Sequence, residues 1–196
     1  MTRRLYWASK NQHKILEARR ILGHTLWEIV PCPQDIALPE EEEETFEGNA
    51  LLKARALADR VNGPVVAEDS GLVVASLDGK PGVRSARFAG PGADDAQNIA
   101  LLLRLLERFP AREQRKATFV AVVCLVEDGR ERFFRGTADG YIARAPKGTG
   151  GFGYDPVFEP AGASRTFAEL KPEEKDAVSH RSIALRRLAE YLASKG

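Results

Sequence analysis

The sequence predicts an α/β protein, and two observations on the 196-residue chain support that class. Apolar residues that recur at steps of three and four predict helices, and short apolar runs predict strands. These strands and helices alternate early in the chain, whereas hairpin signals appear late. The order favours a mixed β-sheet flanked by helices. The length suits one domain, residues 1–196, with a single sizeable core.

The early elements follow from local patterns. Residues 3–9 form an expected strand, which leads into a helix over residues 11–22 and a strand over residues 26–30. A second helix is expected to begin after Thr45, a good N-cap residue, and to end before Pro64. Its core face carries residues at helical spacing: Phe46, Ala50, Ala54, Leu57 and Val61.

A short apolar strand over residues 65–67 runs directly into Glu68 and Asp69. We therefore expect this acidic pair at the C-terminal end of a strand, where ligands bind in α/β sheets. Either Asp94 or Asp95 is expected to cap the next helix. The core face of that helix is predicted to hold Ile99, Leu102, Leu103 and Leu106.

The later elements are a hairpin and a final helix. Residues 117–126 are almost continuously apolar, which predicts a strand buried on both faces. The dipeptide at 128–129 is Asp-Gly, a hairpin turn that leads into a strand over residues 131–137. Residues 182–192 predict the last amphipathic helix.

Composition excludes several classes of protein. Lysine and arginine total 29 against 28 acidic residues, and this net charge of +1 gives no field for binding a nucleic-acid polymer. No apolar run approaches the roughly 18 residues of a membrane span. The first residues, MTRR, lead into a strand rather than a signal peptide, so we expect a cytoplasmic protein. Cys32 and Cys124 lack metal-ligand spacing and are expected to be reduced.

Residues 150–156 are GGFGYDP, the most informative stretch of the chain. Glycine permits positive φ and close backbone approach, while Phe152 and Tyr154 offer apolar ring faces. Asp155 precedes a proline that restricts its backbone. These properties suit a pocket for a flat base. The alternative is a tight turn whose aromatic residues belong to the core.

Residues 9–14, SKNQHK, lie at a strand-to-helix turn. A helix N-terminus offers free N–H groups to a phosphate, and Ser9, Asn11 and Lys14 add donors. The segment lacks the glycines of a P-loop. The alternative is an N-cap followed by solvated polar residues.

Two groups of carboxylates suit a metal ion. Residues 40–44 are all glutamate, and Glu68 and Asp69 lie on a separate element. Mg²⁺ binds oxygen ligands, commonly one or two carboxylates together with substrate phosphates. A run of glutamates is otherwise a solvated loop.

Donors gather again before the last helix, where Lys175 precedes Ser179, His180 and Arg181. Such donors favour an anion or a carbonyl-rich base. His180 is a candidate general base, although no serine or cysteine triad accompanies it. The alternative is an ordinary lysine-rich surface at a helix start.

Together these clusters predict a nucleotide site, and their motifs resemble those of the inosine triphosphate pyrophosphatase family. The matching motifs follow the family's order and span almost the whole chain. They are Ser9-x-Asn11-x-x-Lys14, Thr45-Phe46-x-x-Asn49-Ala50-x-x-Lys53-Ala54, Glu68-Asp69-Ser70-Gly71-Leu72, Ser85-Ala86-Arg87, Gly151-Phe152-Gly153-Tyr154-Asp155-Pro156 and Lys175-x-x-x-Ser179-His180-Arg181.

The resemblance implies an elongated mixed sheet with flanking helices, two lobes with the active site between them, and a homodimer. It implies Mg²⁺ held by Glu40 and Asp69, with Asp69 also the catalytic base. The residues that it places at the triphosphate are Ser9, Asn11, Lys14, Lys53 and Ser70. The residues that it places at the base and sugar are Phe152, Gly153, Tyr154, Asp155, Lys175, His180 and Arg181.

Two positions depart from the family's pattern. The family usually has a Glu-x-Thr-Gly-like stretch where this chain has residues 40–44, so Glu41 competes with Glu40 for the metal role. The family's common Asp-Asp pair is Glu68-Asp69 here, which keeps the charge and lengthens one arm.

The activity that the resemblance implies is Mg²⁺-dependent hydrolysis of non-standard purine nucleoside triphosphates, namely ITP, dITP and XTP. The products would be a nucleoside monophosphate and pyrophosphate. Two alternatives are a non-catalytic purine nucleotide sensor and a broader nucleoside triphosphate diphosphatase.

Overall fold

A computed structural model describes residues 3–195 and contains one six-stranded sheet in the order β2-β1-β3-β4-β5-β6. Strand β1 pairs in parallel with β2 and β3, whereas β5 and β6 are antiparallel, so the sheet is mixed. The predicted α/β class is therefore confirmed. The strands are β1 Arg3–Trp7, β2 Trp27–Pro31, β3 Val65–Val74, β4 Lys116–Glu127, β5 Arg130–Ile142 and β6 Phe158–Pro160. Residues 1 and 2 of the N-terminal MTRR segment lie outside the described residues.

Three predicted helix starts are confirmed by their caps. The side chains of Asn11, Thr45 and Asp94 each accept a hydrogen bond from a backbone N–H in the first turn of the helix that follows. A short helix before the last one was not predicted. The helices are α1 Gln12–Leu22, α2 Phe46–Ala58, α3 Asp95–Leu105, α4 Pro172–Val178 and α5 His180–Ala193.

The chain forms two compact units. Among the described residues, unit 1 comprises residues 3–69, 121–136 and 180–195, and unit 2 comprises residues 70–120 and 137–179. The long strands β3, β4 and β5 each contribute residues to both units. The single domain and the cleft that the resemblance implies stay predictions.

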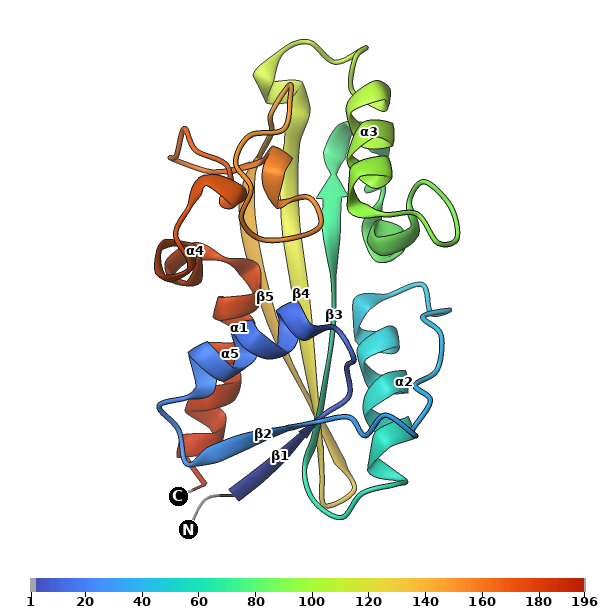
Figure 1. Cartoon of the computed structure of the whole chain (residues 1–196), viewed down its shortest axis with the longest axis vertical. Coiled ribbons are helices and arrows are strands. Elements are labelled where there is room, and N and C mark those ends of the chain that lie inside the picture. Colours follow the sequence, from blue (N-terminus) through green and yellow to red (C-terminus); the bar gives the residue numbers. More distant parts are fainter. Residues whose placement is uncertain (1–2, 196) are drawn as a thin grey trace. The chain divides into compact units, whose positions relative to one another are not determined.

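Unit 1 has helices on both faces of its strands because side chains alternate along β3. Val66 packs with α1 and α5, whereas its neighbours Val65 and Ala67 pack with α2. Figure 1 shows α1 beside α5, with α2 across the strands from them. Each apolar face of β3 is therefore buried by its own helices. Cys124 is buried in the α2 layer, and both cysteines are free thiols in the structure.

The core of unit 2 is built on aromatic rings. Leu72 and Val74 of β3 pack in one cluster with α3 and with three phenylalanines. The ring centroids of Phe119 lie 4.6 Å from Phe158 and 5.9 Å from Phe167, and Phe158 lies 4.9 Å from Phe167. This cluster buries the start of β6 and the turn around Phe167.

The expected position of the acidic pair at a strand's end is wrong. Strand β3 continues to Val74, so Glu68 and Asp69 lie in its middle. The apolar run resumes at Leu72, and a buried strand tolerates polar residues where neighbouring elements supply partners. Strand β5 is likewise longer than predicted and reaches Ile142.

Replacing Arg115 by methionine is expected to destabilise the protein. This side chain is buried, and its guanidinium donates to three carbonyl oxygens, of Leu106, Ile142 and Ala143, at 2.8–2.9 Å. Methionine removes all three buried hydrogen bonds from a charged donor, although the Leu106 carbonyl oxygen still accepts from the Phe109 N–H, and the loss costs about 3 kcal/mol or more. Denaturant unfolding measures the loss. The exposed Arg104 of α3 is the control, and equal stability of Arg115→Met and Arg104→Met would contradict the expectation.

Among the described residues, none of the helices combines the length and the apolar character that crossing a bilayer requires.

Candidate active site

The centre of the candidate site in unit 1 is the middle of β3. Because successive side chains on a strand point to opposite faces, Glu68 and Asp69 point in opposite directions. Glu68 contacts residues of α1 and α5, whereas Asp69 contacts residues of α2. One dipeptide therefore connects two groups of polar side chains.

Asp69 is 2% exposed and is held by α2. The Asn49 amide donates to Asp69 Oδ2 at 3.0 Å, and Lys53 Nζ lies 3.9 Å from Oδ1. Burial raises the pKa of Asp69 to about 6; Lys53 opposes this shift and Glu41 adds to it. A carboxylate with a pKa near neutrality suits a general base, because its proton affinity lies close to the operating pH.

The acidic run reaches this group through Glu41. Lys53 Nζ forms an ion pair with the Glu41 carboxylate and also donates to the Glu68 carbonyl oxygen at 2.9 Å. Glu41 is half-buried and contributes to the shift in the pKa of Asp69, so the two carboxylates are near one another. Glu40 is exposed. The geometry thus favours Glu41 over Glu40 as the second carboxylate of the site.

The structure places Asn49 in the candidate site, although the sequence motifs predict no role for it. Its side chain is fully buried. Besides donating to Asp69, it accepts from the Glu43 backbone N–H at 3.0 Å and so ties the acidic run to the site. A signal existed in the sequence: Asn49 and Lys53 are polar residues one helical turn apart within an apolar stripe.

The predicted phosphate-binding segment forms the start of α1. Asn11 Oδ1 accepts from the Lys14 backbone N–H at 3.2 Å, and Ser9 Oγ accepts from the Asn11 N–H at 3.1 Å. Lys14 Nζ lies 3.7 Å from Glu68 Oε1. Burial lowers the pKa of Lys14, and Glu68 opposes that shift. The segment therefore brings a lysine ammonium to the strand that carries Asp69.

Arg181, predicted to lie at the base, is bonded to two carboxylates in unit 1. Its Nε donates to both oxygens of Glu68 at 2.9 Å, and its Nη1 donates to Glu17 Oε2 at 2.5 Å. Burial raises the pKa of Glu68, but Arg181 and Lys14 outweigh it and hold this pKa well below its usual range. Glu68 is therefore ionised. His180, the residue before, is buried at the start of α5.

The glycine-rich segment lies in unit 2, and its backbone explains its glycines. Gly151 has a φ of 71°, and a Cβ there would lie 2.0 Å from Asp155 Oδ2. That oxygen accepts from the Phe152 N–H at 2.9 Å, while the Gly153 N–H donates to Asp95 Oδ2 at 2.6 Å. Asp155 thus stabilises the turn. The Phe152 side chain is half-buried.

Lys175 joins this turn from α4. Its buried ammonium donates to Asp155 Oδ2 at 2.7 Å and lies 5.3 Å from the centroid of the Phe152 ring. Tyr154 instead belongs to the core of unit 2, where its hydroxyl donates to the Ser85 carbonyl oxygen at 2.8 Å. Ser70, which the resemblance places at the triphosphate, is half-buried. Within unit 2 the structure therefore brings together Phe152, Asp155 and Lys175.

The oxygen donors around Asp69 fit a hard divalent cation. In the described chain no three histidine, cysteine or acidic side chains gather closely enough to bind a metal by themselves. Glu41 and Asp69 supply two carboxylates, and Mg²⁺ commonly uses one or two carboxylates with waters and substrate phosphates. The donor set suits a metal that arrives with a polyphosphate.

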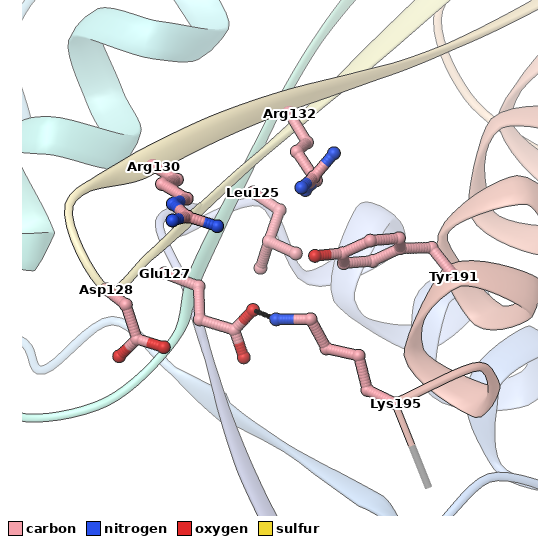
Figure 2. A pocket seen from close by; sticks show the side chains of 7 residues that line it. All are labelled: Leu125, Glu127, Asp128, Arg130, Arg132, Tyr191 and Lys195. Carbon is pink, nitrogen blue, oxygen red and sulfur yellow. Dashed lines mark hydrogen bonds and ion pairs between the residues drawn. The ribbon is translucent and has the colours of Figure 1, made fainter.

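A pocket of about 280 Å³ lies elsewhere in unit 1, at the β4–β5 turn and the end of α5 (Figure 2). Its lining contains none of the predicted site residues. Lys195 there forms an ion pair with Glu127, and Arg132 lies 4.8 Å from the centroid of the Tyr191 ring. These cations already have partners, so the pocket receives no ligand assignment.

The fold and these polar groups define a mixed α/β protein in which lysines from two helices surround a pair of carboxylates on the central strand β3. The chain belongs to the Ham1 family, which it matches over residues 5–191. A dITP/XTP pyrophosphatase from Symbiobacterium thermophilum is 49% identical over 191 residues, which cover 97% of this chain and 95% of that protein. A dITP/XTP pyrophosphatase from Mycobacterium tuberculosis is 48% identical over 196 residues, with 97% and 96% covered.

Comparison with solved structures supports the assignment to this family. A HAM1 protein from Coxiella burnetii superposes with a TM-score of 0.90 at 38% identity, over 98% of this chain and 99% of that chain. The nucleoside-triphosphatase / dITP/XTP pyrophosphatase from Mycobacterium abscessus gives a TM-score of 0.75 at 46% identity, over 94% and 98%. The resemblance predicted from the motifs is confirmed.

Proposed function

We propose that this protein hydrolyses non-standard purine nucleoside triphosphates, namely ITP, dITP and XTP, to the nucleoside monophosphate and pyrophosphate. The observation that carries the proposal is the buried Asp69 between Asn49 and Lys53, where burial raises its pKa to about 6. The names of the curated relatives support the substrate class. Removing such nucleotides would keep the cell's nucleotide pool clean.

Asp69 is the proposed base for a water that attacks the α-phosphorus in line. The Asn49 amide holds the carboxylate in place, and a pKa raised to about 6 suits it to accept the water's proton. Lys14 and Lys53 are the proposed counter-charges for the triphosphate and for the departing pyrophosphate. Ser9, Asn11 and Ser70 are the further proposed phosphate contacts.

Mg²⁺ is the proposed cofactor, held by Asp69 and Glu41. Glu40, the ligand that the resemblance predicts, is exposed, so the geometry supports it less than Glu41. When bound, the ion would supply Lewis-acid polarisation of phosphate oxygens. Lys53 contacts Glu41 and lies close to Asp69, so it keeps the two carboxylates together before a cation binds. This arrangement reduces the repulsion between the like charges.

The turn over residues 150–156 is the proposed base site. Phe152 is the proposed stacking ring, and the Lys175 ammonium beside it is the proposed donor to the six-oxo group of the purine. Adenine presents an amine at that position, which offers this ammonium no acceptor, and such a mismatch can discriminate strongly. His180 and Gly153 stay predicted base contacts. Tyr154 and Asp155 support the turn from within unit 2.

Replacing Phe152 by alanine is expected to raise the KM for inosine triphosphate by about tenfold or more, the usual worth of stacking a base on an aromatic ring. Turnover at saturation is expected to change less, because the ring is proposed to contact the base and to take no part in the reaction at the phosphates. Steady-state kinetics measure both constants. Phe133→Ala, on the exposed part of β5, is the matched control. An unchanged KM in Phe152→Ala would remove the stacking role.

The proposed function is tested by measuring pyrophosphate release with Mg²⁺ from inosine, xanthosine, adenosine, guanosine and cytidine triphosphates. Fast turnover of the first two alone supports it. Equal turnover of all five would indicate a broader diphosphatase, and binding without turnover would indicate a nucleotide sensor. Omitting Mg²⁺ is expected to abolish release, and full activity in a chelator would contradict the proposed metal.

We also infer that the protein acts in the cytoplasm, because its two cysteines are free and its proposed substrates belong to the nucleotide pool. The homodimer that the resemblance implies stays a prediction. Sedimentation equilibrium tests it.

A further inference from the structure

Glu17 is an acidic residue on the core-facing side of α1. It is 8% exposed and lies between Ile15 and Ala18, both of which are buried in an apolar cluster. Burying an ionised carboxylate is costly unless it is paired and hydrogen-bonded. An acid at this position therefore requires a specific partner.

The partner is Arg181, which is 2% exposed and comes from the first turn of α5. Its guanidinium bridges two acids: Nη1 donates to Glu17 Oε2 at 2.5 Å, and Nε donates to both oxygens of Glu68 at 2.9 Å. A guanidinium has a rigid planar fork of donors, so fixing one end orients the other. Glu17 thereby determines how Arg181 meets Glu68.

The bridge continues to the proposed phosphate site. Glu68 Oε1 lies 3.7 Å from Lys14 Nζ, and Lys14 is three residues before Glu17 on α1, on the same helix face. The charges alternate from Lys14 through Glu68 and Arg181 to Glu17. All four residues belong to unit 1. A shift of Glu68 would withdraw the counter-charge that holds the Lys14 ammonium in place.

We propose that Glu17 is a positioning residue of the active site, which acts through Arg181 and Glu68 to hold Lys14 for the triphosphate. The inference rests on the proposed function. It also assigns Arg181 to the support of Glu68 instead of to reading the base. Losing Glu17 therefore weakens binding of the triphosphate, which all substrates share, and leaves selectivity among bases unchanged.

The test uses Glu17→Leu and inorganic tripolyphosphate, a probe without a base, titrated with Mg²⁺ present by calorimetry. Because Glu17→Leu removes a hydrogen bond between charged groups, we expect the dissociation constant for tripolyphosphate to rise about tenfold or more. The ratio of kcat/KM for inosine triphosphate to that for guanosine triphosphate is expected to stay within about twofold of wild type. A merely structural role would lower stability without selectively weakening binding of tripolyphosphate.

Two further variants sharpen the result. Glu17→Gln keeps an oxygen that accepts from Arg181 and is expected to restore binding to within about threefold of wild type. Glu131→Leu breaks the Arg55–Glu131 pair on the surface of unit 1 and is expected to bind normally. If Glu17→Leu yields no folded protein, Glu17→Asp, which shortens the arm, is expected to weaken tripolyphosphate binding by about threefold or more.

Unchanged tripolyphosphate affinity in a folded Glu17→Leu protein would overturn the positioning role, and so would a changed ratio between the two nucleotides. Failure of the proposed function looks different. In that case the wild-type protein itself releases no pyrophosphate from inosine triphosphate, whether or not it binds tripolyphosphate.

Discussion

Replacing Asp69 by asparagine is expected to lower kcat for inosine triphosphate by about a hundredfold or more, the usual worth of a positioned general base. Asparagine keeps the shape of the side chain and can still accept from the Asn49 amide, so the geometry of β3 and α2 is preserved. What it loses is the ability to take a proton from water and the charge that a metal requires. Pyrophosphate release at saturating substrate measures the effect.

The control for this variant is Asp59→Asn, at the exposed C-cap of α2, which is expected to retain wild-type turnover. Near-normal turnover by Asp69→Asn would rule out the base assignment. A loss of the same size in Asp59→Asn would point to a general effect on α2 instead.

Asp69→Asn is also expected to melt at a temperature at least as high as the wild type at pH 7 without metal. The folded state raises the pKa of Asp69 from 3.8 to about 6, so ionising this group opposes folding above pH 6. That penalty shrinks as the pH falls from 6 towards 4, because the folded aspartate is then protonated and protonating it in the unfolded chain costs less as the pH nears 3.8. The difference in melting temperature is expected to shrink over the same range. A difference that grows towards pH 4 would contradict the burial argument.

The second large effect is expected for Lys53→Met, which should reduce kcat/KM by about a hundredfold, as losing one stabilising charge in a buried site does. Lys53 pairs with Glu41, donates to the Glu68 carbonyl oxygen and lies 3.9 Å from Asp69 Oδ1. Methionine has a similar length and no charge. Without the ammonium, Glu41 and Asp69 repel one another, and the proposed pyrophosphate leaving group loses a counter-charge.

The matched control is Lys195→Met, which removes another lysine of unit 1 that pairs with a glutamate, Glu127, outside the site. Surface pairs contribute little, so wild-type kinetics are expected. Lys53→Arg keeps the charge but presents a broader group and is expected to fall between the two. Full activity in a folded Lys53→Met protein would show that the ammonium has no part in the reaction.

Local patterns in the sequence were sufficient for the helix starts. Thr45 was predicted as a cap, Asp94 was one of two candidates, and the helix start near Asn11 was predicted within one residue, because an N-cap depends on a side chain and a backbone N–H a few residues away. The α/β class followed from the alternation of strand and helix patterns, which depends on local periodicity. The short helix α4 was missed because a polar segment of seven residues has no such period.

The environment of the candidate site could not be predicted in this way. Asp69 was expected at a strand's end but lies within β3, which runs on to Val74. A polar residue is tolerated inside this buried strand because Asn49 and Lys53 of the neighbouring helix α2 supply its partners. Asn49 and Asp69 meet across 20 positions of the chain, and Arg181 and Glu17 across 164. Such pairs depend on which face of a strand or helix each side chain occupies after packing.

The sequence by itself determined which chemical groups this protein has and, through their order, its family. The tertiary structure alone decided how those groups are used. It favoured Glu41 over Glu40, placed Tyr154 in the core, and bonded Arg181 to Glu68 and Glu17. The physical reason is that a buried charge must be paired, and its partner is chosen by proximity in space instead of by position along the chain.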